Sequence, residues 1–587
     1  SSRQGRMQWL PTKIPCPVTV SFGEPMSNES RPDEVRVAVE HLAEGASRLS
    51  ADELRPLHVA FVKRVRRAPW RHCLADSQGK KLSRGSSLAG AVVMARRLRP
   101  HWGDQQNVGI MLPPSIGGAL VAFAASLSGR TSVSLNYTVG SAAMASAVRQ
   151  AGLTSLVTSK AFLERLPQEM LDGLVGLEMI LLEDVMQGVS TFERLGGMMR
   201  ALLWPMGTLE RACGAKRRVT RDDVAAILFS SGSTGEPKGI MLSHKNLQAN
   251  ADAIAQVVPS DHTDKLVGVL PMFHSFGNLA LWYAVGQGAG IVFHPNPLEA
   301  AAVGHLVASN AATVLIATPT FLQLYNRRCE PGQFGSLRLV LTGAERLTDD
   351  LADAFADRFG LRPIQGYGAT ECAPAISVCA PGYRAPGFYQ AGSRRGSVGR
   401  PLPGVTVRIV DPDTREPVPI GETGMVLVRG ANVMLGYLGR DDLTEKAMHD
   451  GCYITGDIGR MDTDGFLFLT DRLSRFSKIG GEMVPHGAIE DHLQDCTSRH
   501  DRAFAVCGIP DERKGERLAV LTTLPESAMP EVLDKMGRRG LPALFLPRKN
   551  QFVHVDALPL LGTGKLDLRK IKQVAMDAGR QEQGADA

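Results

Sequence analysis

The chain has 587 residues, 44% of them hydrophobic and 21% charged, a balance typical of a globular protein that is too long for a single hydrophobic core. Its net charge of +6 is compatible with an acidic protein partner or an anionic membrane surface, whereas no compact Lys/Arg run is interleaved with aromatic residues, which argues against nucleic-acid binding. The nine cysteines include no C-x-x-C pair, which argues against a metal site and favours a reducing compartment.

The first 50 residues differ in pattern from the rest of the chain. Residues 17–26 (PVTVSFGEPM) predict a short strand that runs into a turn, and residues 31–49 predict a helix with proline and acidic residues in its first turn. This strand–turn–helix resembles the closing segment of a PlsC-type glycerolipid acyltransferase domain. The resemblance implies that residues 1–50 are the C-terminal remnant of such a domain and a linker.

From about residue 55 onward, apolar strands alternate with helices. A helix of small residues is predicted at 115–127, and strands are predicted at 108–112, 131–136, 156–159, 291–293 and 314–317. This alternation predicts a layered α/β fold with mostly parallel strands. Between 396 and 470 the strands become short and are separated by Gly, Pro and Asp; the alternating runs 405–410 and 424–429 predict a β-rich subdomain.

The stretch 195–218 is apolar with basic flanks. Two interpretations are open for it. It is either an interfacial element that lies on a membrane or a surface helix that packs on the protein body, and the second is favoured.

The stretch SSGSTGEPKG at 230–239 is the most informative motif. Hydroxyls and backbone N–H groups in a glycine loop can surround phosphate oxygens, and a lysine adds a point charge. The stretch is not a Walker A motif, because Pro237 stands where that motif needs its second glycine. It resembles the phosphate loop of the adenylate-forming superfamily, which comprises acyl-CoA synthetases, luciferases and nonribosomal adenylation domains. The expected ATP-binding residues here are Ser230, Ser231, Gly232, Ser233, Thr234, Gly235 and Lys238.

The stretch GYGATE at 366–371 carries the next set of candidates. Gly366 and Gly368 would let the adenine lie against the Tyr367 ring, Thr370 can donate to the α-phosphate, and Glu371 is a hard oxygen ligand suited to Mg²⁺. The stretch resembles the second core motif of the same superfamily. Two further matches accompany it. The segment Gly343, Ala344 and Glu345 resembles the one that packs on the other face of the adenine, and His274 in PMFHSFG matches a position between the ATP site and the acyl tunnel, which implies a gate or positioning role.

The stretch YITGD ends on Asp457, whose carboxylate can accept hydrogen bonds from both hydroxyls of a ribose. Arg472 would add a donor to the ribose or phosphate side. Near the chain end, Lys565 in PLLGTGKLD resembles the catalytic lysine of the superfamily, which bridges the substrate carboxylate and the α-phosphate.

The apparent hinge reads DRLSRFSKIGGEMV and begins at Asp471. Arg475 stands where the superfamily commonly has Asp. The stretch resembles bacterial acyl-acyl-carrier-protein synthetase/2-acylglycerophosphoethanolamine acyltransferases. In this resemblance Lys478, Gly480 and Gly481 serve the thioester step, the two glycines allowing a pantetheine arm to approach the backbone.

Together the resemblances imply an adenylate-forming fold with a large adenylation domain at 51–474 and a small, mobile α+β domain at 475–587. They imply ATP and Mg²⁺ as cofactors and a fatty acid loaded through an acyl-adenylate onto acyl-carrier protein. A long-chain fatty acyl-CoA ligase and a catalytically idle acyl-adenylate-binding module are the alternatives, with a luciferase-type oxygenase more remote. The parent protein is expected at the cytoplasmic face of the inner membrane, where an upstream domain would contact the lysophospholipid; the present segment is expected to be soluble and cytoplasmic.

Overall fold

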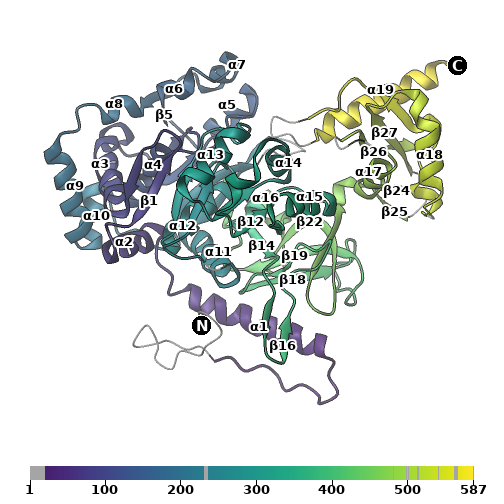
Figure 1. Ribbon diagram of the computed structural model, residues 1–587, viewed down its shortest axis with the longest axis horizontal. Helices are drawn as coiled ribbons and strands as arrows, with labels where there is room; N and C mark the ends of the chain where they lie inside the picture. The colour runs from purple at the N-terminus through teal and green to yellow at the C-terminus, as the bar shows by residue number, and fades with distance from the viewer. Residues whose placement is uncertain are drawn as a thin grey trace.

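The computed structural model describes residues 20–230, 236–258, 260–479, 482–497, 499, 502–511, 515–539, 541–560 and 566–585. Two large sheets form the body of this part of the chain (Figure 1). The strands of the first are β1 His72–Asp76, β2 Lys81–Ser83, β9 Lys265–Gly268, β10 Gly290–Phe293, β11 Val314–Ala317, β12 Leu339–Thr342, β13 Ile364–Gly368, β14 Ala375–Val378 and β17 Arg400–Pro401. Their order is β17-β14-β13-β12-β11-β9-β10-β1-β2, parallel from β13 to β1.

The second large sheet has the order β20-β8-β7-β4-β3-β5-β6 and is parallel from β7 to β6. Its strands are β3 Asn107–Ile110, β4 Thr131–Ser134, β5 Ser155–Thr158, β6 Glu178–Leu181, β7 Val224–Ser230, β8 Lys238–Ser243 and β20 Gly436–Tyr437. Strands such as β11 and β5 are buried along their whole length, because helices cover both faces of a parallel sheet. This explains why they appear in the sequence as short apolar runs.

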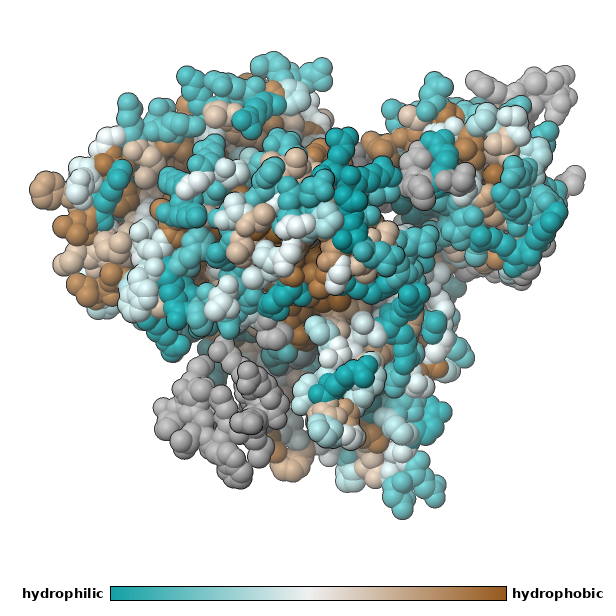
Figure 2. Space-filling model, in the orientation of Figure 1, coloured by the Kyte–Doolittle hydropathy of each residue, from teal (hydrophilic) through white to brown (hydrophobic). Residues whose placement is uncertain are grey.

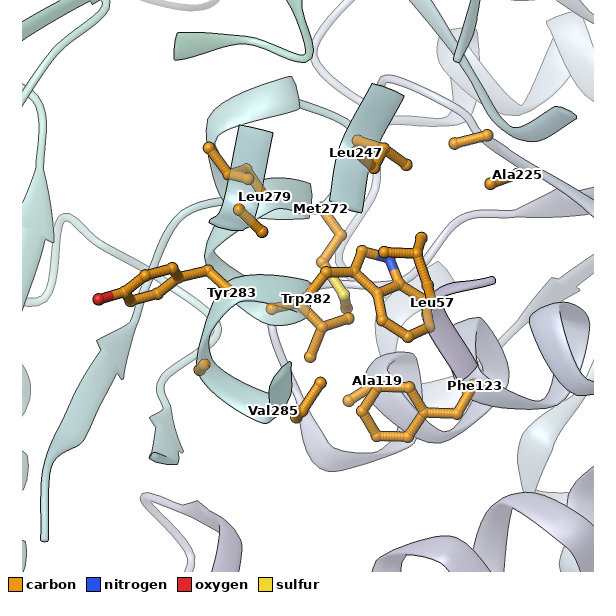
Figure 3. Close-up of a cluster of buried hydrophobic side chains, with 14 of the residues drawn as sticks. Leu57, Ala119, Phe123, Ala225, Leu247, Met272, Leu279, Trp282, Tyr283 and Val285 are labelled. Atoms are coloured by element: carbon orange, nitrogen blue, oxygen red, sulfur yellow. The ribbon is translucent and has the colours of Figure 1, made fainter. Parts of the chain in front are cut away.

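Four helices lie between the two large sheets: α2 Leu57–Arg67, α4 Ile116–Leu127, α11 His244–Val257 and α12 Ser275–Gln287. Helix α4 contacts β1 of one sheet and β3 and β4 of the other. Aromatic rings fill this layer: the centroid of the Phe123 ring lies 4.5 Å from that of Phe61 and 5.4 Å from that of Trp282. Figure 3 shows Phe123 and Trp282 among the surrounding apolar side chains. The layer fixes the carboxyl ends of both sheets relative to each other.

The remaining helices cover the outer faces and the connections. They are α1 Pro32–Ala51, α3 Arg84–Trp102, α5 Ser141–Gln150, α6 Lys160–Leu163, α7 Gln168–Leu171, α8 Leu182–Met186, α9 Thr191–Leu203, α10 Met206–Cys213, α13 Ala300–Asn310, α14 Pro319–Arg328, α15 Asp349–Phe359 and α16 Asp441–Lys446. No helix among the described residues combines the length and the apolarity needed to span a bilayer.

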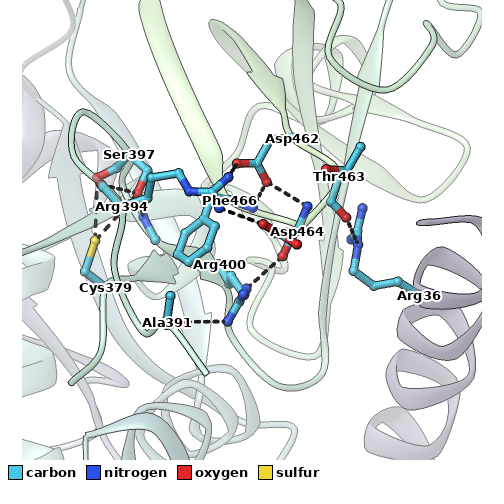
Figure 4. A network of polar contacts seen from close by, with 11 residues as sticks. Arg36, Cys379, Ala391, Arg394, Ser397, Arg400, Asp462, Thr463, Asp464 and Phe466 are labelled. Atoms are coloured by element: carbon cyan, nitrogen blue, oxygen red, sulfur yellow. Dashed lines mark hydrogen bonds and ion pairs between the residues drawn. The ribbon is translucent and has the colours of Figure 1, made fainter. Parts of the chain in front are cut away.

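A β-rich sheet follows, with the order β18-β19-β22-β21 and β23 paired to β22. Its strands are β18 Val405–Val410, β19 Gly424–Gly430, β21 Met448–His449, β22 Cys452–Met461 and β23 Leu467–Arg472. Arg394 bridges Asp462 and Asp464 at the turn between β22 and β23, and Arg36 of α1 donates to the Thr463 carbonyl (Figure 4). Helix α1 also contacts β18 and β19, so this sheet anchors the N-terminal part of the chain. A short hairpin of β15 Tyr383–Ala385 and β16 Phe388–Gln390 projects nearby.

The C-terminal unit is a sheet of order β25-β24-β27-β26 with β28 paired to β27. Its elements are β24 Phe476–Ile479, β25 Glu482–Pro485, α17 His486–Asp495, β26 Phe504–Asp511, β27 Gly515–Thr522, α18 Met529–Gly537, β28 Phe552–His554 and α19 Leu568–Ala585. Alternate residues of β26 face opposite sides: Val506 packs with α17 and α18, whereas Ala505 packs with α19. The unit therefore has its own hydrophobic core, and the boundary at 474/475 stays a prediction.

Most predicted elements lie within two residues of the observed ones, but the strand predicted at 17–26 is wrong in its described part. Residues 20–26 form no regular structure, and Val20 and Phe22 are exposed. A strand needs a neighbour to satisfy its backbone groups, and none of the described strands pairs with this segment.

Candidate active site

The carboxyl ends of the parallel strands β12 and β13 bring the two predicted adenine segments together. Thr342 and Gln365 are paired in register, so the residues that follow them, Gly343 and Gly366, lie side by side. A Cβ atom added to Gly343 would lie 3.4 Å from the Gly366 carbonyl oxygen. Such a position at the end of neighbouring parallel strands is where open α/β sheets bind ligands.

The residues after Gly343 turn sharply. Ala344 has a φ of 69°, in the left-handed region. The Glu345 carboxylate accepts hydrogen bonds from the backbone N–H and the hydroxyl of Thr320, at 3.1 and 2.6 Å. Glu345 therefore fixes this turn to the start of α14, and its backbone is the part left to face a base.

Tyr367 and Asp457 meet although they are far apart in sequence. The Tyr367 hydroxyl donates to Asp457 Oδ2 at 2.5 Å, and Arg472 Nε donates to Asp457 Oδ1 at 3.1 Å. Burial, followed by the Asp457 charge, raises the pKa of Tyr367 well above its usual value, and the same charge raises the pKa of Arg472. The tyrosine thus stays a neutral donor and the arginine a cation. Each Asp457 oxygen has a second lone pair available for a ribose hydroxyl.

Thr370 and Glu371 lie on the short 3₁₀ turn after β13. The Thr370 hydroxyl is 3.2 Å from that of Ser275, the first residue of α12. The Tyr437 hydroxyl donates to Glu371 Oε1 at 2.9 Å, and the Met434 N–H donates to the Glu371 carbonyl at 2.7 Å. These contacts hold Glu371 between the first large sheet and the segment that carries β20.

The phosphate-loop motif begins and ends on an antiparallel hairpin. Ser230 of β7 pairs with Lys238 of β8, which closes the base of the loop. Lys238 Nζ lies 5.1 Å from the centroid of the Tyr437 ring. The same ring thus contacts Lys238 with its face and the Glu371 carboxylate with its hydroxyl, so the lysine and the carboxylate are neighbours.

The donor set around Glu371 is compatible with Mg²⁺. Among the described residues, no group of three or more His, Cys, Asp or Glu side chains could hold a metal ion, and Glu371 Oε2 has no hydrogen-bond donor. Mg²⁺ usually keeps several waters and takes one or two protein carboxylates together with substrate phosphates. A single available carboxylate oxygen beside a phosphate loop meets this requirement.

His274 is exposed and immediately precedes α12. Its ring centroid lies 4.6 Å from that of Phe273, which in turn packs edge-on against Tyr137 at 4.7 Å. The histidine therefore stands at the end of an aromatic row, one residue before Ser275.

The hinge segment carries a cluster of buried charges. Arg475 Nη2 lies 2.7 Å from Glu490 Oε1 on α17, and Arg475 Nε lies 3.7 Å from Asp471 Oδ1. Asp471 Oδ2 also accepts from the Gly487 N–H at 2.6 Å. The unexpected arginine at the hinge is thus paired with one carboxylate on β23 and one on α17, on either side of the hinge. One more ion pair, Arg346 with Asp491, joins that unit to the body.

The structure describes only some of the residues that the sequence predicts for the phosphate loop and the thioester step. The backbone of Lys478 lies in β24, opposite Met483. The predicted residues that lie outside the described part of the chain are Ser231, Gly232, Ser233, Thr234, Gly235, Gly480, Gly481 and Lys565.

The sequence interpretation missed the residues that support the site. Asn250 of α11 makes paired hydrogen bonds with the Ala375 backbone, at 2.7 and 3.0 Å, and Asn432 Nδ2 donates to the Cys372 carbonyl at 2.8 Å. Tyr437 was missed as well. The stretch NVMLGYLG, which contains two of these residues, offers only a weak signal: polar residues in an otherwise apolar segment between strands.

Fold and motifs together define an ATP-dependent, acyl-adenylate-forming ligase. The family model described as "AMP-binding enzyme" matches residues 61–438, well over half of the chain. The chain belongs to the AMP-binding enzyme family.

Curated relatives and solved structures agree with this assignment. A feruloyl-CoA synthase of Amycolatopsis sp is 33% identical over 351 residues, 59% of this chain and 68% of the relative. A long-chain-fatty-acid–CoA ligase of Salmonella typhimurium (strain LT2) is 30% identical over 369 residues, 61% of this chain and 63% of the relative, so the alignment spans less than two thirds of that enzyme.

Among solved structures, o-succinylbenzoate CoA synthetase from Bacillus subtilis in complex with the acyl-adenylate intermediate has a TM-score of 0.72 at 23% identity, over 87% of this chain and 97% of that one. The same synthetase in complex with ATP and magnesium ion has a TM-score of 0.71 at 23% identity, over 88% and 99%. These likenesses show the fold.

Proposed function

We propose that this chain activates a fatty acid with ATP through an acyl-adenylate and then transfers the acyl group to the phosphopantetheine thiol of acyl-carrier protein. The observation that carries the first half is the cluster at the ends of β12 and β13. Tyr367 with Asp457, and Tyr437 with Glu371, lie there beside the hairpin that carries Lys238. A base platform, an acceptor for a diol and a hard oxygen ligand are thus close to a phosphate loop.

ATP supplies the electrophilic α-phosphorus, and Mg²⁺ offsets charge on the phosphate oxygens. A carboxylate oxygen of the fatty acid bonds to the α-phosphorus, and pyrophosphate leaves. In this proposal Asp457 accepts from the ribose hydroxyls, Glu371 holds Mg²⁺ and Thr370 donates to the α-phosphate. Lys238 and the loop that it closes bind the departing pyrophosphate.

The later steps depend on residues of the C-terminal unit. Lys565 stabilises the negative charge that develops as the carboxylate attacks. The unit then rotates, so that Lys478, Gly480 and Gly481 line the approach of the pantetheine arm. The thiolate attacks the acyl carbon, and AMP leaves with the electron pair of the broken C–O bond.

Two voids of about 10 and 20 Å³ lie beside α12, and their mostly apolar linings are of the kind that an acyl group requires. One is lined by residues of β3, β4 and α4, including Ala122, and the other by residues of β9, β10 and α12, including Ala280. Met272 lines both cavities. Since His274 follows Met272 by two residues, its proposed role is to gate or position the acyl group at the mouth of this region.

The choice of acceptor rests on resemblance. The hinge stretch from Asp471 resembles acyl-acyl-carrier-protein synthetase/2-acylglycerophosphoethanolamine acyltransferases, and the N-terminal segment resembles the end of a PlsC-type acyltransferase domain. In such a parent protein, the acylated carrier would feed the re-acylation of a lysophospholipid at the cytoplasmic face of the inner membrane. The curated relatives named above are CoA ligases, so CoA is the second candidate acceptor.

Parallel assays with holo acyl-carrier protein and with CoA test the acceptor. We expect thioester formation with palmitate to be faster with the carrier at equal concentrations of thiol. A clear preference for CoA would replace the proposed acceptor with CoA while leaving the first half intact.

The first half is tested by fatty-acid-dependent exchange of pyrophosphate into ATP. Lys565→Ala should lower this exchange by about a hundredfold or more, because removing one preorganised group that stabilises the transition state costs that much. If the unaltered chain supports no exchange with any fatty acid, it is an idle adenylate-binding module.

A further inference from the structure

Helix α9 (Thr191–Leu203) packs on the body through its small residues. Only Gly197 and Ala201 of this helix are buried, and a Cβ atom added to Gly197 would lie 2.8 Å from the Val93 side chain of α3. Met198 and Leu202 are half-buried, but four other large apolar side chains point outward: Phe192, Leu195, Met199 and Leu203, at 87%, 61%, 53% and 67% exposed.

Helix α9 packs on α3, in agreement with the favoured interpretation of residues 195–218, but four of its large apolar side chains face away from the protein body. A helix on the surface of a globular protein ordinarily turns its apolar stripe toward the core. The four outward residues follow one another at intervals of three or four positions, so they lie on one face of the helix. We call them the α9 stripe. Figure 2 shows apolar side chains along the left edge of the molecule, where α9 lies in Figure 1.

An exposed indole side chain follows the helix that contacts the C-terminal end of α9. Arg66 of α2 donates to the carbonyls of Ala201 and Trp204, at 3.0 and 2.5 Å, and so fixes the end of α2 beside the end of α9. Trp70 follows α2 by three residues and is 75% exposed. Indole rings with one apolar and one polar edge are typical of membrane–water interfaces.

The charges of this region are predominantly positive. Residues 191–218 contain six basic and two acidic side chains, and two of the basic ones, Lys216 and Arg217, pair with carboxylates outside this range. Both carboxylates are already paired within the protein: Glu193 with Arg97 at 2.8 Å, and Glu210 with His58 at 2.9 Å in a fully buried contact. The basic side chains Arg200 and Arg211 therefore outweigh the acidic ones on the exposed side.

From these observations we infer that the α9 stripe is the surface by which this chain docks on an anionic lipid bilayer. The apolar residues stand on a convex ridge and line no groove, and they lie at one end of the molecule, so they can all enter the same flat interface. The arginines at the sides of the ridge complement anionic headgroups. If the ridge bound a second protein instead, that protein would be expected to present a matching groove, and the groove would not need to carry negative charge.

Vesicle flotation tests the docking surface with two lipid compositions. We expect the purified chain to float with vesicles of phosphatidylglycerol and phosphatidylcholine in equal parts, to bind pure phosphatidylcholine much more weakly, and to dissociate as salt is added. The variant Phe192→Ser/Leu195→Ser should bind the mixed vesicles at least about tenfold more weakly, because two large apolar groups no longer enter the bilayer.

A matched control keeps the result interpretable. Leu298→Ser/Phe388→Ser removes a leucine at 61% and a phenylalanine at 55% exposure that lie elsewhere on the surface, and it should bind as the unaltered chain does. Thermal unfolding of both variants verifies that they fold. The inference is overturned if the unaltered chain fails to float, if the stripe variant floats equally well, or if light scattering shows a dimer that the stripe variant converts to a monomer. The last result would assign the stripe to a second copy of the chain.

Discussion

Tyr437 joins two parts of the candidate site, and it lies 66 residues from one of them, Glu371, in the sequence. Its hydroxyl donates to Glu371, and its ring lies against Lys238. Tyr437→Phe keeps the ring and removes the hydroxyl, so we expect Glu371 to lose its orientation while Lys238 stays in place. The Mg²⁺ concentration that gives half-maximal adenylate formation should rise about tenfold, the usual effect of removing a partner that orients a metal ligand.

Tyr389→Phe is the matched control for this prediction, because Tyr389 is exposed on the projecting hairpin. It should leave the Mg²⁺ dependence unchanged. An unchanged dependence in Tyr437→Phe as well would mean that Glu371 does not hold the metal or needs no orientation.

At the residue scale, the sequence predicted groups with a chemical role and missed those that support them. Tyr367 and Asp457 stand in short motifs because several neighbouring residues act on one ligand. Asn250 instead acts across 125 residues, on the Ala375 backbone, and only folding brings the two together. A pattern of neighbouring residues in the sequence cannot reveal such a contact.

Among the elements, β13 and the turn after it leave no room for a side chain at Gly368. A Cβ atom there would lie 2.1 Å from the Pro374 carbonyl oxygen, which belongs to the backbone. Gly368→Ala should therefore lower the free energy of unfolding by about 2–3 kcal/mol, the cost of forcing atoms into a packed site. Urea denaturation measures this change, and adenylate formation should fall because Thr370 and Glu371 follow directly.

Gly286 provides the matched substitution. It lies within α12, and a Cβ atom there would meet nothing within 4 Å. Gly286→Ala should stabilise the chain by about 0.5–1 kcal/mol, because alanine loses less backbone entropy in a helix. Equal effects of the two substitutions would contradict the assigned cause.

Helix α11 begins on a buried histidine that makes the chain sensitive to acid. Burial lowers the pKa of His244 to about 3 from 6.5, and its Nδ1 accepts from the Leu57 N–H at 3.4 Å. Below about pH 6.5, His244 is therefore protonated in the unfolded chain but stays neutral in the folded chain. The free energy of unfolding consequently falls as the pH drops below this value. At pH 5 we expect a loss of about 2 kcal/mol from this group relative to neutral pH.

Urea denaturation at a series of pH values checks this dependence. His244→Gln should reduce the slope of stability against pH between about pH 6 and pH 4 by nearly one proton. The exposed His101 serves for comparison, and His101→Gln should leave the slope much closer to that of the unaltered chain. A slope that His244→Gln does not alter would contradict a neutral, buried His244.

At the element scale, periodicity predicted the parallel strands well but left the orientation of α9 undetermined. The strand β11 reads as an apolar run because both of its faces are buried. For α9, the sequence contains an apolar stripe but does not say which way it faces. Small residues such as Gly197 let the opposite face approach α3 more closely, and this packing decided the outcome.

Across the whole molecule, the C-terminal unit depends on the buried charges at its start. Burial raises the pKa of Glu490, although Arg475 lies beside it. Arg475→Ala would leave Glu490 buried without its cation and should lower the free energy of unfolding of this unit by about 3 kcal/mol. Limited proteolysis in urea should detect earlier cleavage after β23.

An exposed arginine tests whether the burial of the ion pair, rather than the loss of one positive charge, causes the expected loss of stability. Arg538 pairs with Asp534 on α18, and both side chains are mostly exposed, at 77% and 60%. Arg538→Ala should change stability by no more than about 0.5 kcal/mol. If the two alanine variants behave alike, the Arg475 cluster does not hold the unit together.

At this scale the sequence predicted the layered body and the β-rich sheet from the pattern of apolar runs, and the fold class from motifs that resemble those of one superfamily. The sequence did not predict the ion pair of Arg475 at the hinge. Arg475 was visible as a departure from the superfamily pattern, but its partner Glu490 lies on the next helix and carries no motif of its own.

Because β20 pairs with β8, one edge of the second large sheet is completed late in the synthesis of this protein. Strand β8 carries Lys238 at the base of the phosphate loop, but its outer edge is covered only when Gly436 and Tyr437 arrive, far downstream. Until then, β8 is an open edge strand, which other chains can extend. A growing polypeptide therefore carries an aggregation-prone edge beside an incomplete nucleotide site, and so would any chain shortened to end before residue 436.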